Sequence, residues 1–177
     1  MKKLTGFFRH ALVVIFFLGC ITASAAEKTG HSGFAETPQA GWKAPDFSLQ
    51  AITGETVKFR DYRGKVVFLY FWAPWCHFCK EEFPQLKKLL NRFKDRGLSV
   101  IAIAVDSRGN VDSFVKRNRA DFPILIDQYG SAVRPYKVES LPVSFVIGRD
   151  GTVLSTITGP KDYLSEEATG FFEELLK

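Results

Sequence analysis

The sequence predicts a single α/β domain, built around a mixed β-sheet with helices on both of its faces. Apolar runs typical of buried strands alternate with segments of helical periodicity, and the chain ends in a hairpin followed by a helix. The composition agrees with one domain and a full core, because 46% of the 177 residues are hydrophobic and 24% are charged.

The first half of the domain is predicted to contain a hairpin, a buried strand and a long helix. Residues 45–59 have the pattern of a β-hairpin with its turn near Thr53–Gly54. The continuous apolar run at residues 66–71, VVFLYF, is typical of a strand buried on both faces. Apolar side chains at helical spacing then predict a helix from about Cys76 to about Arg96.

The second half supplies the remaining strands and helices in the same alternating order. The predicted strands are residues 98–106, a short one within residues 122–127, residues 143–147 and residues 152–158. Helical segments are predicted at residues 110–119, around residues 131–136 and from about Pro160 to the end of the chain. Asp150–Gly151 predicts a tight hairpin turn before the last strand.

Residues 1–26 have the layout of a secretory signal peptide. Basic residues precede an apolar run at residues 11–21, and small residues follow it, so that cleavage is expected after Ala25 or Ala26. The apolar run is too short for a comfortable membrane span, which takes about 20 residues. Residues 27–41 are then a linker rich in small and polar residues, and residues 42–177 form the domain.

Two alternatives for this segment stay open. Leu18–Gly19–Cys20 loosely resembles the site at which bacterial lipoproteins are cut and acylated, although Phe17 fits that pattern poorly. The other alternative is that the segment stays uncut and anchors the domain to the membrane. All three interpretations place the domain outside the cytoplasm, most simply in a periplasm, with or without a membrane tether.

The net charge predicts no nucleic-acid partner. Of the formal charge of +5, residues 1–26 carry three positive charges and no negative one, which leaves +2 for the rest of the chain. The basic clusters of the domain lie on predicted helices among polar neighbours. This pattern is typical of solvated helix faces rather than of binding patches.

The cysteine pair in WCHFC indicates redox chemistry. Removal or lipidation of Cys20 leaves only Cys76 and Cys79, which are too close in sequence to staple distant parts of a fold. Cys76 stands at the predicted helix start, where backbone N–H groups lack partners, and residues 73–75 offer no capping side chain. Its sulfur is therefore expected to accept from those groups, which lowers its thiol pKa.

The residues around the pair argue against three other uses of a C-x-x-C motif. Covalent haem attachment needs a His directly after the second cysteine, where this chain has Lys80. A structural zinc site needs four ligands, whereas residues 27–177 add only His31 and His77 to the two cysteines. A peroxidatic cysteine normally follows a Thr or Ser by three residues, and Ala73 stands there. We therefore expect no metal and no cofactor.

The stretch FWAPWCHFCKEEFPQL resembles the active-site segment of thioredoxin-like proteins. It is most similar to the exported TlpA/ResA group, which is related to the AhpC/TSA redoxins and linked to cytochrome c maturation. The resemblance covers residues 42–177 through KAPDFSL, FPILIDQYG, LPVSFVI and GRDGTV. It implies a thioredoxin-like fold with an N-terminal β-hairpin and an inserted strand and helix segment.

The resemblance implies that Cys76 is the exposed nucleophile and Cys79 the buried thiol that resolves the mixed disulfide. The group also has an acidic residue three positions after the second cysteine, which is Glu82 here. Helical spacing independently turns Glu82 inward below Cys79, where burial would raise its pKa and allow proton exchange with that thiol. The alternative is a surface Glu82. Thioredoxin itself has a buried Asp where this chain has Tyr70, so the acid/base role falls to Glu82.

Three further residues are implied in substrate binding. Leu141–Pro142 stands in the place of the family's cis-proline, whose preceding residue pairs its backbone with a bound peptide. Trp75 is expected to pack beside the reactive sulfur and to shape the contact surface, and its alternative is a core aromatic.

His77 and Phe78 depart from the family pattern, which commonly has Pro just before the second cysteine. A cationic His77 would stabilise the Cys76 thiolate and make the pair more oxidising. The alternative is an exposed imidazole with little effect.

The sequence thus predicts an exported thiol:disulfide oxidoreductase that acts as a monomer and reduces protein disulfides. The resemblance implies apocytochrome c as a substrate class and a membrane electron donor of the DsbD or CcdA kind. A net oxidant or isomerase of secreted proteins is the second hypothesis, and a non-catalytic metal-binding module is the third.

Overall fold

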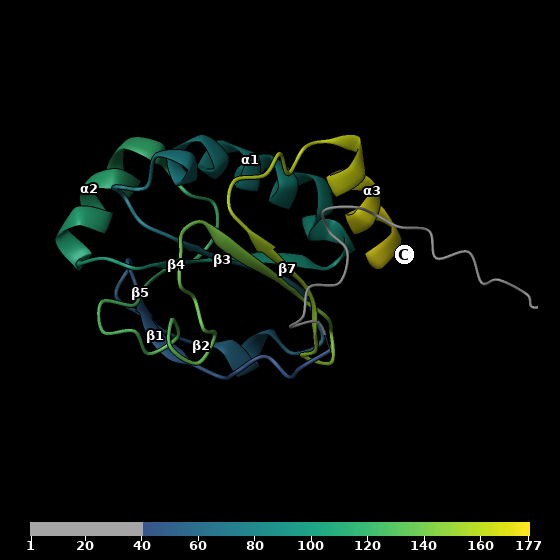
Figure 1. The fold of residues 1–177 in the computed structure, drawn as a ribbon, viewed down its shortest axis with the longest axis horizontal. Coiled ribbons are helices and arrows are strands. Elements are labelled where there is room, and N and C mark those ends of the chain that lie inside the picture. The colour runs from purple at the N-terminus through teal and green to yellow at the C-terminus, as the bar shows by residue number, and fades with distance from the viewer. Residues whose placement is uncertain (1–40) are drawn as a thin grey trace, which may run out of the picture.

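The computed structural model describes residues 41–177, which form a seven-stranded mixed sheet covered on both faces (Figure 1). The strand order is β2-β1-β5-β4-β3-β6-β7, in which β3, β4 and β5 are parallel and the other neighbours pair in antiparallel fashion. The strands are β1 (Ser48–Ala51), β2 (Thr56–Lys58), β3 (Val66–Trp72), β4 (Leu98–Ala104), β5 (Ile124–Ile126), β6 (Val143–Ile147) and β7 (Val153–Thr158). The predicted α/β class with a mixed sheet is confirmed.

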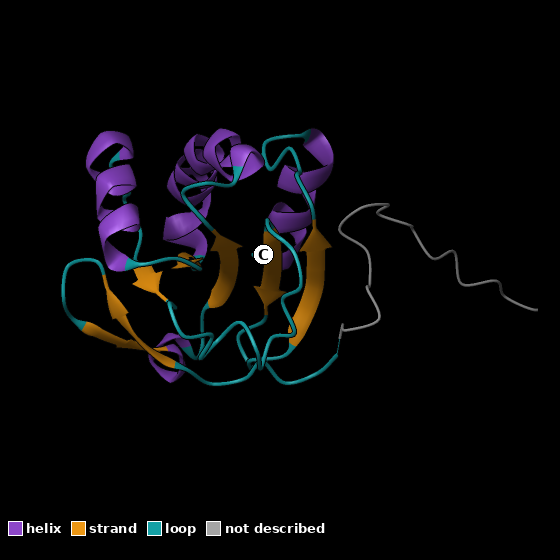
Figure 2. Cartoon of the chain, turned by 60° about the vertical axis from the view of Figure 1, so that its left-hand side comes forward, coloured by secondary structure: helices purple, strands orange, loops and turns teal. Residues whose placement is uncertain are grey.

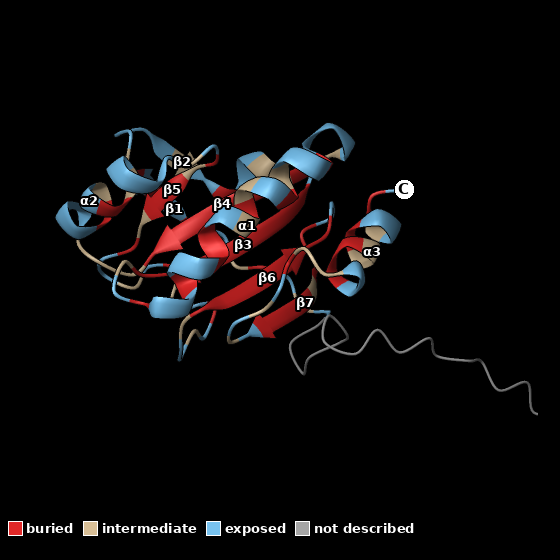
Figure 3. Ribbon diagram, turned by 90° about the horizontal axis from the view of Figure 1, so that it is seen from above, coloured by how far each residue is buried: buried red, intermediate tan, exposed pale blue. Residues whose placement is uncertain are grey.

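Strand β3 lies inside the sheet, between β4 and β6, and all seven of its residues are buried. Because side chains alternate along a strand, Phe68, Tyr70 and Trp72 point into one core and Leu69 and Phe71 into the other. The prediction that residues 66–71 form a strand buried on both faces is therefore confirmed. Figure 3 shows the buried strands beneath helices whose outer sides are exposed.

The three α-helices all lie on the face of the sheet that Tyr70 and Trp72 share (Figure 2). They are α1 (His77–Phe93), α2 (Arg108–Asn118) and α3 (Glu166–Leu175). Of the described residues, those that cover the second face belong to the 3-10 helix η1 (Phe59–Tyr62), the chain before β1, and helical turns at residues 130–136. Helices were predicted on both faces, and the helical structure described on this second face consists of short pieces.

The helical turns of the second face stay short for a local reason. Their i to i−4 hydrogen bonds run only from the Arg134 N–H to the Gly130 carbonyl and from the Tyr136 N–H to the Ala132 carbonyl. Lys137 then adopts φ +52°, a left-handed conformation that ends the helical path.

The predicted elements are found within a few residues of their expected bounds, except for the last helix. Helix α3 begins at Glu166 rather than near Pro160, because Ser165 caps it by accepting from the Ala168 N–H at 3.2 Å. In the segment before α3, Tyr163 is completely buried. The backbone N–H groups of this segment donate to the side chains of Glu82 and Gln85 on α1. The predicted Asp150–Gly151 hairpin turn is present, with Gly151 at φ +81°.

Asp127 fixes the segment that covers the second face. Its buried carboxylate accepts from the N–H groups of Ser131, Ala132 and Val133 at 2.6, 2.8 and 2.8 Å. We expect Asp127→Ala to lower the free energy of unfolding by about 3 kcal/mol, since a buried N–H without a partner costs about 1–3 kcal/mol. Urea denaturation measures the loss. Asp127→Asn keeps one acceptor oxygen and should lose less, so equal losses would contradict this account.

The predicted signal, lipoprotein and anchor alternatives concern residues that lie outside the described part of the chain, as does the linker apart from Gly41. Among residues 41–177, none of the helices has both the length and the apolar character needed to cross a membrane.

Candidate active site

The two cysteines lie at the start of helix α1 and are joined as a disulfide. Cys76 is the N-cap residue, with extended backbone angles of φ −73° and ψ 115°. Its sulfur accepts from the backbone N–H of Cys79 at 3.2 Å, which satisfies one of the free donors of the first helical turn. The predicted capping role of Cys76 is confirmed.

The two cysteines differ in how far they are exposed to solvent. Cys76 is 6% exposed and Cys79 is fully buried in the core under α1. The order of exposure is the one that the sequence predicts, although in the disulfide state Cys76 itself is almost covered. Of the two cysteines, Cys76 is thus the more accessible.

Glu82 lies one helical turn after Cys79 on the inward face of α1. It is 2% exposed, and the same face carries the buried Leu86, Leu89 and Phe93. The alternative of a surface Glu82 is therefore wrong. Helical periodicity dictates this placement, because residues three and four apart share a face.

Both carboxylate oxygens of Glu82 have a donor. The hydroxyl of Tyr70 donates to Oε2 at 2.6 Å, and the backbone N–H of Lys161 donates to Oε1 at 2.7 Å. Burial raises the pKa of Glu82 above its ordinary value, and these two hydrogen bonds partly oppose that rise. A carboxyl group with a raised pKa is suited to take up a proton near neutral pH.

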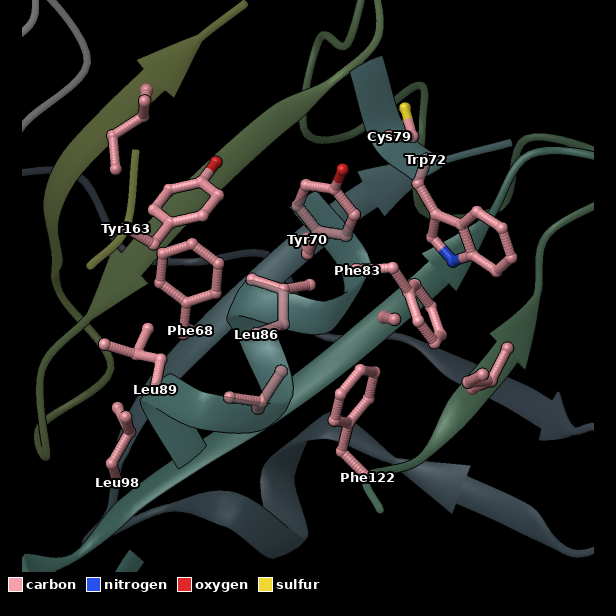
Figure 4. Packing of buried hydrophobic residues seen from close by; sticks show 14 of the residues in the cluster. Phe68, Tyr70, Trp72, Cys79, Phe83, Leu86, Leu89, Leu98, Phe122 and Tyr163 are labelled. Atoms are coloured by element: carbon pink, nitrogen blue, oxygen red, sulfur yellow. The ribbon is translucent and has the colours of Figure 1, made fainter. Parts of the chain in front are cut away.

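Tyr70 and the Lys161 N–H are site groups that sequence reasoning missed. Tyr70 is fully buried on β3, on the same face of the sheet as α1, and Figure 4 shows its hydroxyl directed toward the end at which Cys79 lies. The period of two along β3 was an available signal, because it places Tyr70 on the face of Trp72. The Lys161 contact had none, because a backbone amide leaves no mark in the side-chain pattern.

The aromatic residues next to the cysteines face solvent. Trp75 is 67% exposed and Phe78 is 48% exposed, so the core-aromatic alternative for Trp75 is wrong. The His77 side chain is 77% exposed, and its Nε2 lies 3.2 Å from a Glu81 carboxylate oxygen one turn along the helix. Its ring also meets that of Phe78 at 5.7 Å. The contacts of His77 are thus with Glu81 and Phe78, and its predicted effect on Cys76 stays a prediction.

Leu141–Pro142 forms a cis peptide bond, as the resemblance implies. Pro142 is buried just before β6, and Leu141 is half-buried. The Pro142 carbonyl accepts from the Gly159 N–H at 2.9 Å. Residues 159–161 therefore connect the cis-proline to Glu82, whose Oε1 accepts from Lys161.

Within residues 41–177, His, Cys, Asp and Glu side chains form no group of three or more that is placed to hold a metal ion. What the site does hold is a disulfide, an exposed aromatic rim and a buried carboxyl group. Those parts suffice for thiol–disulfide exchange, which needs an accessible sulfur, a second sulfur and a proton acceptor.

Comparison with known proteins agrees with this chemistry. A model of the AhpC/TSA family matches residues 40–156. The chain is 34% identical to the thiol-disulfide oxidoreductase ResA of Bacillus thuringiensis subsp. konkukian, over 100% of this chain and 98% of the relative.

Solved structures agree as well. A protein from Chlorobium tepidum assigned as thiol:disulfide interchange protein DsbE superposes with a TM-score of 0.74 at 35% identity, over 78% of this chain and 98% of that one. The thioredoxin domain of a thiol-disulfide oxidoreductase from Bacteroides vulgatus, 20% identical, matches in fold with a TM-score of 0.71 over 80% of this chain and 100% of that one. The fold is therefore thioredoxin-like. The chain belongs to the AhpC/TSA family, and within it to the ResA group of thiol-disulfide oxidoreductases.

Proposed function

We propose that this protein reduces disulfides of other proteins outside the cytoplasm, with Cys76 as nucleophile and Cys79 as resolving thiol. The observation that carries the proposal is the placement of the pair. Cys76 caps helix α1 and keeps a small exposed fraction of 6%, Cys79 is fully buried behind it, and the buried Glu82 lies one turn further along. This order separates a sulfur that meets the partner from one that acts only within the protein.

The reaction takes two exchange steps. The Cys76 thiolate attacks a partner disulfide, which forms a mixed disulfide and releases one partner sulfur as a thiolate. The Cys79 thiol then gives its proton to Glu82, and its sulfur attacks Cys76. The Cys76–Cys79 disulfide closes and the second partner sulfur leaves, so that the partner gains two electrons and, with protons from solvent, two thiols.

The exposed rim supplies the contact surface for the partner. Trp75 lies directly before Cys76 and presents an indole of which most is open to solvent. The half-buried Leu141, which precedes Pro142, offers its backbone to an extended peptide segment, as the family resemblance implies. The proposed substrate-binding residues are therefore Trp75, Leu141 and Pro142.

Location and partners follow from the sequence. The signal-like residues 1–26 support an extracytoplasmic, most simply periplasmic, domain. Regeneration of the reduced pair then calls for a donor that carries electrons across the membrane, of the DsbD or CcdA kind. Apocytochrome c is the substrate class that the resemblance favours, because its C-x-x-C-H cysteines must be reduced before haem attachment.

The test is the Cys79→Ser variant expressed in the cell. Without the resolving thiol, the mixed disulfide at Cys76 should persist, and non-reducing gels followed by mass spectrometry should identify exported proteins bound to it. The Cys76→Ser/Cys79→Ser double variant is the matched control and should trap nothing. Recovery of no Cys76-dependent adduct would overturn the proposal.

The direction of electron flow is read from the reduction potential of the pair. A potential below about −200 mV places the protein among reductants, whereas a value near about −120 mV is that of a strong oxidant. The second result would favour net oxidation of secreted proteins instead. Equilibration with glutathione buffers of known ratio gives the value.

A further inference from the structure

We propose that Tyr70 is a positioning residue for the exchange reaction, because its hydroxyl holds the Glu82 carboxyl group in both of that group's protonation states. The proposal rests on the proposed role of Glu82 as the proton acceptor of Cys79. It adds a residue that the C-x-x-C motif and its flanking acid do not contain.

The geometry of the contact is that of a strong hydrogen bond. Tyr70 is fully buried on β3, Glu82 is 2% exposed on α1, and the hydroxyl donates to Oε2 across 2.6 Å. Donation to a carboxylate is charge-assisted and worth more than a neutral hydrogen bond. Since the tyrosine ring is packed between the sheet and α1, its oxygen has a fixed position.

The chemistry of a phenol suits a carboxyl group that gains and loses a proton. A hydroxyl both donates and accepts, whereas a backbone N–H only donates. When Glu82 is ionised, Tyr70 donates to Oε2. When Oε2 carries the proton, the hydroxyl rotates about its C–O bond and accepts it, and when Oε1 carries the proton, Tyr70 continues to donate. The Lys161 N–H has no such freedom.

The other groups that face Glu82 leave this role to Tyr70. Glu81, its neighbour on α1, carries a negative charge that raises the pKa of Glu82. Tyr163, from the segment before α3, is fully buried, and its hydroxyl shares a hydrogen bond of 2.9 Å with Ser144. Burial raises the pKa of Tyr163, so that it is neutral in the physiological range. Cys79 lies on the same face of α1, one turn earlier.

Tyr70→Phe tests the proposal, because it removes one oxygen and keeps the ring. In the reduced protein with ¹³C-labelled glutamate, the titration of the Glu82 carboxyl carbon should move to higher pH, because the ionised form loses a donor. The rate at which Cys79 resolves a mixed disulfide should move with it. At a pH on the acid side of that profile, we expect the variant to react about tenfold more slowly.

The matched control is Tyr136→Phe, which removes a phenol hydroxyl from the opposite face of the sheet. That hydroxyl donates to the Pro45 carbonyl at 2.9 Å, and Tyr136 is as buried as Tyr70. The control should leave both the Glu82 titration and the rate profile in place. An unmoved Glu82 titration in Tyr70→Phe, or an equal movement in the control, would overturn the proposal.

A second measurement needs no change at Tyr70. In the wild-type protein, the resonance of the Tyr70 ring carbon that bears the hydroxyl should titrate with the same midpoint as Glu82, and this titration should vanish in Glu82→Gln. Its persistence there would count against the coupling.

These readouts also separate failure of this proposal from failure of the proposed function. The carboxyl titration uses no substrate, so it reports on Tyr70 even if the protein reduces nothing. A moved titration with an unmoved rate profile would refute Glu82 as the proton acceptor, and with it the positioning role. An unmoved titration would refute the role of Tyr70 alone.

Discussion

Replacement of Cys76 with Ser is expected to lower the rate of disulfide exchange by at least about 10³-fold, because Cys79 is the one other cysteine within residues 41–177. Cys79 cannot substitute for it, since its side chain is fully buried behind the helix start. The measurement is the single-turnover reduction of insulin disulfides by the pre-reduced protein. A variant that keeps more than a tenth of the wild-type rate would contradict the assignment of Cys76.

Serine is the informative substitution because of the position of Cys76 in the helix. Cys76 is the N-cap residue of α1, and Ser is among the best N-cap residues, so its hydroxyl takes over the acceptor role toward the Cys79 N–H. Helix α1 should therefore be retained. Loss of activity together with an unchanged circular dichroism spectrum separates the chemistry from folding.

Glu82→Gln is expected to slow the resolution step by about 100-fold at neutral pH, within the range usual for loss of a general base. The substitution preserves the contacts, since the amide oxygen accepts from Lys161 and the amide nitrogen donates to Tyr70. Stopped-flow measurement of the decay of a preformed mixed disulfide at Cys76 isolates this step. The rate of the first attack, by Cys76, is the internal control and should change little.

The same variant has an expected effect on stability with a definite sign. Burial raises the folded-state pKa of Glu82, so the folded protein binds this proton more tightly than the unfolded chain. The resulting stability is fully present below the unfolded-state pKa and is lost as pH rises through the folded-state value. In Glu82→Gln this dependence should disappear. Urea denaturation at a series of pH values measures it for the reduced forms of both proteins, and parallel pH profiles would contradict it.

The parts of the fold that the sequence could predict are those set by side-chain period. The apolar run of β3 and the helical stripe of α1 each have one solution, because only that placement buries the apolar residues. The same stripe placed Glu82 inside. The helix start near Cys76 followed from the same helical spacing, the acceptor role of its sulfur followed from the absence of a capping side chain at residues 73–75, and the structure shows both.

The parts that the sequence could not predict depend on contacts between distant segments. Helix α3 begins late because the preceding chain is held by acceptors on α1, which no local pattern reveals. For Tyr70, the period of two along β3 gives the face of the sheet but not the partner of the hydroxyl. A tyrosine in an apolar run is an ordinary core residue until the strand is placed against the helix that carries Glu82.

The hold of α1 on the segment before α3 limits how the dithiol can be transplanted between proteins. Glu82 accepts from the Lys161 N–H, and Gln85 accepts from the Tyr163 N–H at 2.9 Å. A graft of the four residues from Cys76 to Cys79 keeps both acceptors. A graft of a whole helix from another protein, with apolar residues at positions 82 and 85, keeps the cysteines. It leaves the N–H groups of Lys161 and Tyr163 without their acceptors. A segment that can be exchanged between proteins is therefore either shorter than α1, or it includes both α1 and the segment before α3 that α1 binds.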